Sequence, residues 1–176
     1  MSKDLVRKRA FVAFLFLVSV FFLLSYIFDR VVVTWGESVP YRVFLKSSAL
    51  PSKGDYVALE TPKNDKFAQG KIITKRVVCV GGEVLKINQL HYYCCKSKTD
   101  DLHECAYLGK AKLYSKTGEP VTPFNPCGVS STCVVRIPNG KYFVANEHVD
   151  SYDSRYFGFV GQNSTYKILY TMRPFF

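Results

Sequence analysis

An uncharged run of 19 residues, Ala10 to Phe28, limits what this chain can become. As a helix it spans about 28 Å at about 1.5 Å per residue, which is enough to cross the hydrocarbon core of a bilayer once. A short basic tail precedes the run, and its charged residues are Lys3, Asp4, Arg7, Lys8 and Arg9. Because positive charge stays on the cytoplasmic side, we expect the tail in the cytoplasm and everything after residue 30 exported.

The same run also fits a second interpretation, a cleavable signal peptide. It is longer than the apolar core of a usual signal peptide, and Ser25 to Val33 holds no small-x-small cleavage site. We therefore predict a retained anchor and three parts: a cytoplasmic tail at 1–9, a transmembrane helix at 10–28 and an exported domain at 29–176.

The composition is typical of a folded domain behind a membrane anchor. Hydrophobic residues make up 48% and aromatic residues 15%, which excludes a disordered chain. The net charge of +10 stays positive without the tail and suits an anionic membrane surface, so membrane lipid is an expected partner. The basic residues are scattered and form no helix-turn-helix, zinc-finger or RNP pattern, so we expect no nucleic acid partner.

Short β-rich runs separated by turn residues follow the anchor, which predicts a mostly β exported domain. The predicted strands are Val31–Trp35, Tyr41–Leu45, Asp55–Leu59, Lys71–Val80, Glu83–Ile87, Cys133–Ile137, Lys141–Ala145, Tyr156–Val160 and Tyr166–Met172. Residues from about 90 to 132 hold four of the six cysteines and many polar residues. This stretch indicates a Cys-rich insertion between two β blocks.

The first motif that can carry chemistry is Gly36-Glu37-Ser38-Val39-Pro40. Ser38 lies eight residues after Arg30, at the charged end of the anchor, so it is held close to the outer membrane face. A serine there can reach a substrate that is still embedded in the bilayer. Taken alone, Ser-x-Pro is also common turn chemistry.

The second motif is the strand around Lys75. Alternation with period 2 places Ile73, Lys75, Val77 and Cys79 on one face. If that face is buried, desolvation lowers the pKa of the lysine and supplies the neutral amine that a serine nucleophile needs as its base. The alternatives are that Thr74 and Arg76 occupy the buried face, or that Lys75 extends to solvent.

The third motif runs from Tyr142 through a polar turn to Gly158. Within it Asp153 and Arg155 can pair locally, and Ser151 can hydrogen-bond a buried amine. The same residues also fit a purely structural, hydrogen-bonded loop.

In this order and behind an N-terminal anchor, the three motifs resemble the type I signal peptidase family. The similarity covers residues 31–60, 71–83 and 141–160. Its most specific parts are Lys75-Arg76-Val-Val and Ser151-x-Asp-Ser-Arg-x-Phe-Gly158, and Lys53-Gly54-Asp55-Tyr-Val57 is similar to the family's Gly-Asp strand start.

The resemblance implies a serine endopeptidase with a signal-peptidase-like β domain and a Ser-Lys dyad, which needs no cofactor. Ser38 would be the nucleophile and Lys75 its base. Ser151 would orient Lys75, and Asp153 would pair with Arg155 and with Arg76.

The spacing between Ser38 and Pro40 is closer to that of one branch of the family. Ser38-Val-Pro40 is one residue shorter than the Ser-Met-x-Pro of housekeeping enzymes and resembles the conjugative-transfer peptidases related to TraF. That branch matures pilins, so the resemblance implies a prepilin substrate and, through capture of the acyl group by an amine, a cyclic product.

Three positions depart from the family pattern. Ala145-Asn146-Glu147 stands where Gly-Asp-Asn is usual, and Gly81-Gly82-Glu83 where Pro-Gly-Asp is usual. Gly36 replaces a hydroxyl residue that often assists the oxyanion hole.

Six cysteines in an exported domain indicate disulfides. The favoured pair is Cys127 with Cys133, and the other candidates are Cys79, Cys94, Cys95 and Cys105. A zinc set of Cys94, Cys95, His103 and Cys105 is disfavoured because vicinal cysteines rarely fit a tetrahedral site. A Ser-His-Asp set around His148 is disfavoured because no Gly-x-Ser-x-Gly elbow supports it.

The leading hypothesis is a single-pass enzyme of the bacterial inner membrane, with a cytoplasmic N-terminus and a periplasmic catalytic domain, that cleaves exported precursors. Two alternatives are a housekeeping signal peptidase I and a non-catalytic membrane assembly factor of a conjugation or secretion system.

Overall fold

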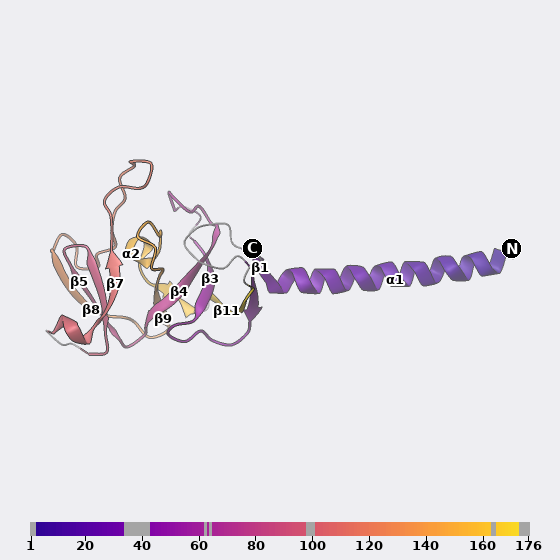
Figure 1. Cartoon of the computed structure of the whole chain (residues 1–176), viewed down its shortest axis with the longest axis horizontal. Helices are drawn as coiled ribbons and strands as arrows, with labels where there is room; N and C mark the ends of the chain where they lie inside the picture. Colours follow the sequence, from indigo (N-terminus) through magenta and orange to yellow (C-terminus); the bar gives the residue numbers. More distant parts are fainter. Residues whose placement is uncertain are drawn as a thin grey trace.

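The computed structural model describes residues 3–33, 43–61, 63, 65–97, 101–162 and 165–172, the backbone alone for residues 3–6 and 165–172. A long helix, α1 (Lys3–Arg30), projects from a β domain (Figure 1). Its segment Arg7–Arg30 has a mean hydropathy of 2.7 and none of it is buried against the protein, so by length and composition it can cross a membrane. The helix is longer than the predicted span because the charged residues at both ends also favour helix.

Seven antiparallel strands form the sheet next to the helix. In spatial order they are β1 (Val31–Val33), β2 (Val43–Ser47), β11 (Thr165–Met172), β3 (Tyr56–Glu60), β4 (Ile72–Val80), β9 (Lys141–Ala145) and β10 (Val160–Gly161). Central strand β4 pairs with β3 on one side and β9 on the other. Its residues are therefore held by two ladders.

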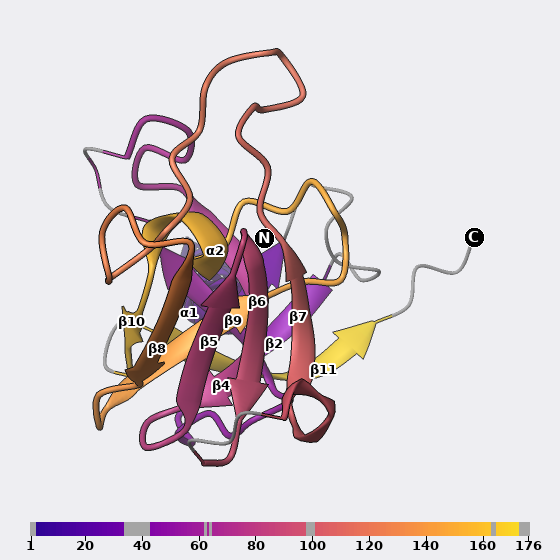
Figure 2. The same cartoon turned by 90° about the vertical axis from the view of Figure 1, so that its left-hand side faces the viewer.

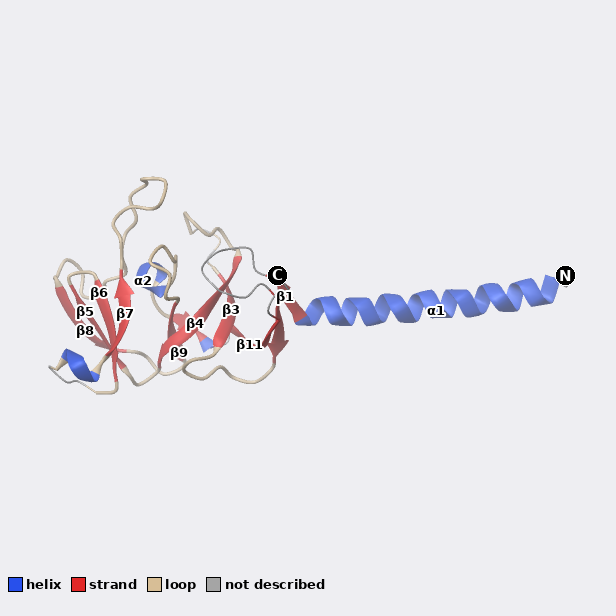
Figure 3. Cartoon of the chain, in the orientation of Figure 1, coloured by secondary structure: helices blue, strands red, loops and turns tan. Residues whose placement is uncertain are grey.

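A second, four-stranded sheet lies at the end of the domain away from the helix (Figure 3). Its order is β7 (Ala106–Lys110), β6 (His91–Cys95), β5 (Val84–Asn88) and β8 (Thr132–Arg136). A 3₁₀ turn, η1 (Leu102–Glu104), precedes β7, and one short helix, α2 (Ser154–Phe157), lies between β9 and β10.

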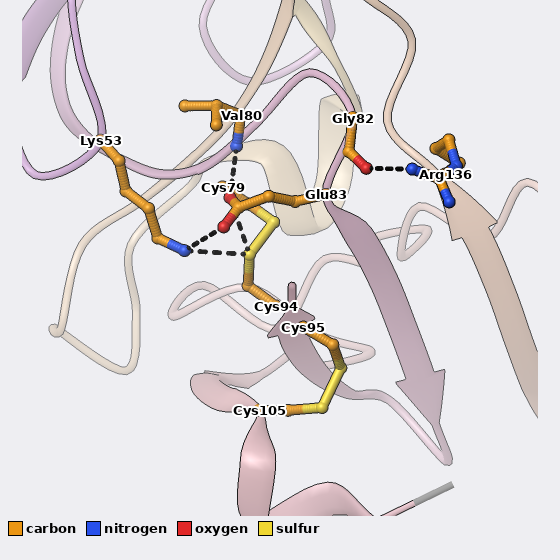
Figure 4. The surroundings of a disulfide bond; sticks show 9 residues. All are labelled: Lys53, Cys79, Val80, Gly82, Glu83, Cys94, Cys95, Cys105 and Arg136. Carbon is orange, nitrogen blue, oxygen red and sulfur yellow. Dashed lines mark hydrogen bonds and ion pairs between the residues drawn. A yellow bond between two sulfur atoms is a disulfide. The ribbon is translucent and has the colours of Figure 1, made fainter. Parts of the chain in front are cut away.

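The sheets share an apolar core and a covalent link. Tyr92 of β6 stacks on Phe143 of β9 with ring centroids 5.8 Å apart, and both side chains are buried. A disulfide joins Cys79 of β4 to Cys94 of β6 (Figure 4). Strand β4 is thereby fixed to both sheets.

Beside this disulfide, the Gly81-Gly82-Glu83 turn is closed by its own glutamate. Glu83 accepts a hydrogen bond of 2.9 Å from Val80 N and one of 2.6 Å from Lys53 Nζ. Gly82 has a φ of +89°, a conformation that glycine adopts without strain. Glu83 therefore anchors the turn that follows β4, at the place where the family usually has aspartate.

The predicted mostly β fold behind one apolar helix is confirmed. Most predicted strands are present within one or two residues of their expected ends, although residues 34, 35, 41 and 42 of the first two lie outside the described residues. Strands β6 and β7 are not predicted from the sequence, and they lie in the segment predicted to be an insertion.

The strand predicted at Tyr156–Val160 is wrong. Asp153 accepts a hydrogen bond from Arg155 N and starts α2, and Gly158, with a φ of +80°, ends it. A capping aspartate and a terminal glycine are helix signals that outweigh the β propensity of the aromatic residues between them.

Candidate active site

Lys75 lies in the middle of β4 and is only 3% exposed. The strand pairs it with Val57 of β3, and its neighbour Arg76 pairs with Ala145 of β9. Val77 is buried on the same face, whereas Arg76 is exposed. Of the arrangements that the sequence leaves open, the one with Lys75 buried is therefore the one that forms, although Thr74 on the opposite face is also buried.

The ammonium nitrogen of Lys75 has one polar partner among the described side chains. Lys75 Nζ donates a hydrogen bond of 2.7 Å to Ser151 Oγ, and Ser151 is 2% exposed. Burial lowers the pKa of Lys75 from 10.5 to about 8; the charge of Asp153 opposes this shift and that of Arg155 adds to it. With a pKa of about 8, roughly a tenth of the Lys75 side chains are neutral at pH 7, and a neutral amine is the form that a general base requires.

Asp153 binds Arg155, as expected, and forms no salt bridge with Lys75, both of these residues being described. Arg155 Nε and Nη2 each donate a 2.8 Å hydrogen bond to one carboxylate oxygen of Asp153. Arg155 Nη2 also donates to Ser151 O at 3.4 Å. This pair therefore holds the backbone of Ser151 while leaving the amine of Lys75 free of a carboxylate.

The expected contact between Asp153 and Arg76 is wrong. Arg76 points to the surface, where its Nε donates to Gly54 O at 3.0 Å and its Nη1 lies 3.9 Å from Glu147 Oε1. Alternation along the strand places it on the side of β4 opposite to Lys75.

Asn146 is a site residue that the sequence analysis noted only as a departure. Its side chain bridges the two peptide groups that flank Lys75, accepting from Arg76 N at 3.1 Å and donating to Thr74 O at 3.2 Å. Its own N–H donates to Asp153 Oδ2 at 3.3 Å. The signal that could have identified Asn146 is its position as a polar residue directly after the strand Lys141–Ala145.

The alternative Ser-His-Asp arrangement does not form. Ser151 Oγ accepts its hydrogen bond from Lys75, and the carboxylate of Asp150 binds Lys112. His148 Nδ1 accepts a hydrogen bond of 3.2 Å from the backbone N–H of Asp150. His148 therefore helps to shape the turn before Ser151.

The cysteines form three disulfides, Cys79–Cys94, Cys95–Cys105 and Cys127–Cys133, the last being the pair favoured from the sequence. The three cysteines of the disfavoured zinc set are all bonded in this way. Cys79, Glu83 and Cys94 also bring their side-chain atoms within 4.8 Å of one another, but the two sulfurs are joined to each other.

Ser38 lies outside the described residues, as do Gly36, Glu37, Val39 and Pro40. The chain reaches this segment from Val33 of β1 and leaves it at Val43 of β2, and these two residues are paired. Ser38 therefore belongs to the connection between the first two strands of the sheet that carries Lys75.

Together these observations define a β protein with an N-terminal apolar helix and a buried lysine whose pKa is lowered. The chain belongs to the family described as signal peptidase, peptidase S26, whose profile matches residues 6–167. Its members are serine peptidases with a Ser-Lys dyad that act on exported proteins at a membrane. The helix and the family together make this a membrane-anchored protein.

Among solved structures, the chain is similar to a signal peptidase I from Enterococcus faecalis V583. The two share 24% identity with a TM-score of 0.41, over 70% of this chain and all of the other. Comparison with curated protein sequences gives no match.

Proposed function

We propose that this protein is a serine endopeptidase that cleaves exported precursors, with Ser38 as nucleophile and Lys75 as general base. The observation that carries the proposal is the buried contact of 2.7 Å between Lys75 Nζ and Ser151 Oγ, in a chain that belongs to the signal peptidase family. A neutral amine has two N–H groups and one lone pair. The hydrogen bond to Ser151 uses an N–H group and leaves the lone pair available to the Ser38 hydroxyl.

The reaction then follows acyl transfer. Ser38 Oγ attacks the scissile carbonyl while Lys75 takes its proton, and Lys75 returns that proton to the departing amine. Deprotonation of water by the same amine releases the product from the acyl-enzyme and regenerates the serine. Ser151 binds Lys75 directly, and the Asp153–Arg155 pair holds the backbone of Ser151 in place.

The finer substrate assignment rests on Ser38-Val-Pro40, whose spacing is similar to the TraF-related peptidases. We propose a prepilin as the substrate, processed on the periplasmic side of a bacterial inner membrane. If the N-terminal amine of the substrate replaces water in the second step, the product is a cyclic pilin, lighter by one water than the linear one.

Mass spectrometry of a candidate pilin, coexpressed with this protein, tests the proposal. Wild-type protein should give a shortened pilin. The variants Ser38→Ala, Lys75→Ala and Lys75→Arg should leave the precursor intact, since a guanidinium stays protonated and cannot act as the base. Residual cleavage above about a tenth of the wild-type level in any of the three contradicts the dyad.

A matched control shows whether the loss of a lysine from this sheet by itself affects processing. Lys141→Ala removes a lysine from the exposed end of the neighbouring strand β9 and should process the precursor at the wild-type level. Full cleavage by Lys75→Ala would instead favour the non-catalytic assembly factor.

A further inference from the structure

The segment between β7 and β8 rises above the four-stranded sheet before it returns to β8 (Figure 2). We call residues 109–124 the arm, so that it includes Gly109 and Lys110, the last two residues of β7. Near its tip Tyr114 and Pro120 form an isolated β-bridge, and Leu113 and Tyr114 are exposed. The base of the arm, by contrast, is in contact with the loop that carries Ser151.

Contacts of the arm reach both ends of that loop. Lys112 Nζ forms an ion pair with Asp150, the residue before Ser151, and Lys116 Nζ lies 3.7 Å from the other carboxylate oxygen. Further along, Lys112 N donates to Tyr156 OH at 2.9 Å and Phe124 N donates to Arg155 O at 2.8 Å. The arm therefore holds the loop on either side of Ser151.

Arg155 carries the most direct connection from the arm to the candidate active site. Its Nη1 donates to Lys110 O of the arm at 3.3 Å, while its Nη2 donates to Ser151 O at 3.4 Å. One buried guanidinium thus joins the arm to the residue that binds Lys75.

Space for this guanidinium exists because residue 109 is glycine. A Cβ built on Gly109 would lie 2.5 Å from Arg155 Nη1, which is closer than any van der Waals contact allows. A side chain at 109 must therefore displace Arg155 or the arm.

We propose that the arm is a positioning element of the candidate active site, which holds Ser151 against Lys75 through Arg155 and Asp150. Its importance for catalysis rests on the proposed function, but the contacts through which it acts do not.

The test compares two glycines of the arm. Gly109 and Gly118 both have positive φ values, of +104° and +80°, so alanine strains the backbone at both. Only at Gly109 does the new Cβ meet Arg155, since nothing lies within 4 Å of the position at Gly118. Gly118→Ala is therefore the matched control for Gly109→Ala.

The readout is the titration of Lys75, followed by NMR of isotope-labelled lysine in the whole chain in detergent micelles. Every chain that is titrated carries Ser38→Ala. The lysine signal that disappears in Lys75→Met is the signal of Lys75. The charged side chains that act on Lys75 are Asp153 and Arg155, and its cross-strand partner on β3, Val57, is apolar.

Displacement of Arg155 moves a positive charge away from Lys75 and leaves the carboxylate of Asp153 without its arginine partner. Both changes raise the titration midpoint of Lys75. We expect Gly109→Ala to raise it by at least half a pH unit, an approximately threefold loss of neutral lysine at pH 7. Gly118→Ala should leave it unchanged. Equal midpoints for Gly109→Ala and wild type, or equal shifts in both variants, overturn the proposal.

If Gly109→Ala does not fold, Lys112→Met decides. It removes the ion pair with Asp150 from a half-exposed position and should raise the midpoint in the same direction; no shift overturns the proposal. The titration needs no catalysis. Its result therefore does not depend on whether the chain with Ser38 intact cleaves the precursor. An inactive enzyme with the expected shift contradicts the proposed function alone.

Discussion

Asp153 and Arg155 form a salt bridge from which water is almost entirely excluded, with side chains exposed by 0% and 2%. Two residues apart in sequence, they join through two parallel hydrogen bonds across the first turn of α2. Such a pair contributes little net stability compared with apolar residues, but the loss of one partner leaves a buried charge.

We therefore expect Asp153→Asn to lower the free energy of unfolding by about 3 to 5 kcal/mol. The double variant Asp153→Asn with Arg155→Met should lose less than the sum of the single variants, because no uncompensated charge remains. Urea unfolding of the four proteins measures this coupling. Additive losses would show that the pair does not act as a unit.

For the proposed enzyme, activity should follow the neutral form of Lys75. Since its pKa is lowered to about 8, kcat/KM should rise about tenfold per pH unit below that value and level off above it. A pH series with a peptide substrate measures the profile. A flat profile between pH 6 and pH 8 contradicts Lys75 as the base.

The same pKa shift predicts how stability depends on pH. The folded state lowers the pKa of Lys75 from 10.5 to about 8, so the unfolded chain binds more protons and stability rises with pH between these values. At pH 7, Lys75→Met should have a higher free energy of unfolding than wild type. This difference should shrink by about 2 kcal/mol by pH 9.5. Parallel unfolding curves measure it; a constant difference contradicts the shift.

Among the disulfides, Cys79–Cys94 should stabilise the fold most. It spans 15 residues and joins the two sheets, whereas Cys127–Cys133 spans six. From loop length alone, replacing both cysteines by alanine should cost about 3 kcal/mol for the first pair and about 2 kcal/mol for the second. Thermal unfolding of the two double variants gives the order, and the reverse order would show that loop length does not govern the cost.

Topology can be tested independently of activity. A reporter that is active only in the periplasm, fused after Phe176, should be active because the basic tail before Ala10 holds the N-terminus inside. A reporter that is active only in the cytoplasm, fused at the same point, serves as the control. Cytoplasmic activity would overturn the proposed orientation.

Local patterns in the sequence predicted the fold class and much of the candidate site. Period-2 alternation predicted β4 and placed Lys75 on one face with Val77, but it left open whether that face is buried. The Asp153–Arg155 pair needed only neighbouring residues. Contacts between segments that are distant in the sequence were harder to predict. Asn146 is visible in the sequence as one polar residue, and its bridge to Thr74 and Arg76 exists only because β9 pairs with β4.

The Cys-rich segment shows the same limit. Its polar composition hid β6 and β7. In β6 the buried residues are Tyr92, Cys94 and the adjacent Cys95, so burial does not alternate regularly along the strand. No periodicity relates Gly109 to Arg155, 46 residues later in the sequence. That relationship is steric and appears only in three dimensions.

The junction between α1 and β1 has a mechanical consequence. The helix ends at Arg30 and the first strand begins at Val31, with no linker between them. The end of the anchor therefore sets the height of the sheet above the bilayer, and with it the distance from the membrane at which the proposed protease would act. Insertion of a few glycines at this junction would give the domain freedom to tilt and would broaden the range of bonds it reaches along a membrane-bound precursor.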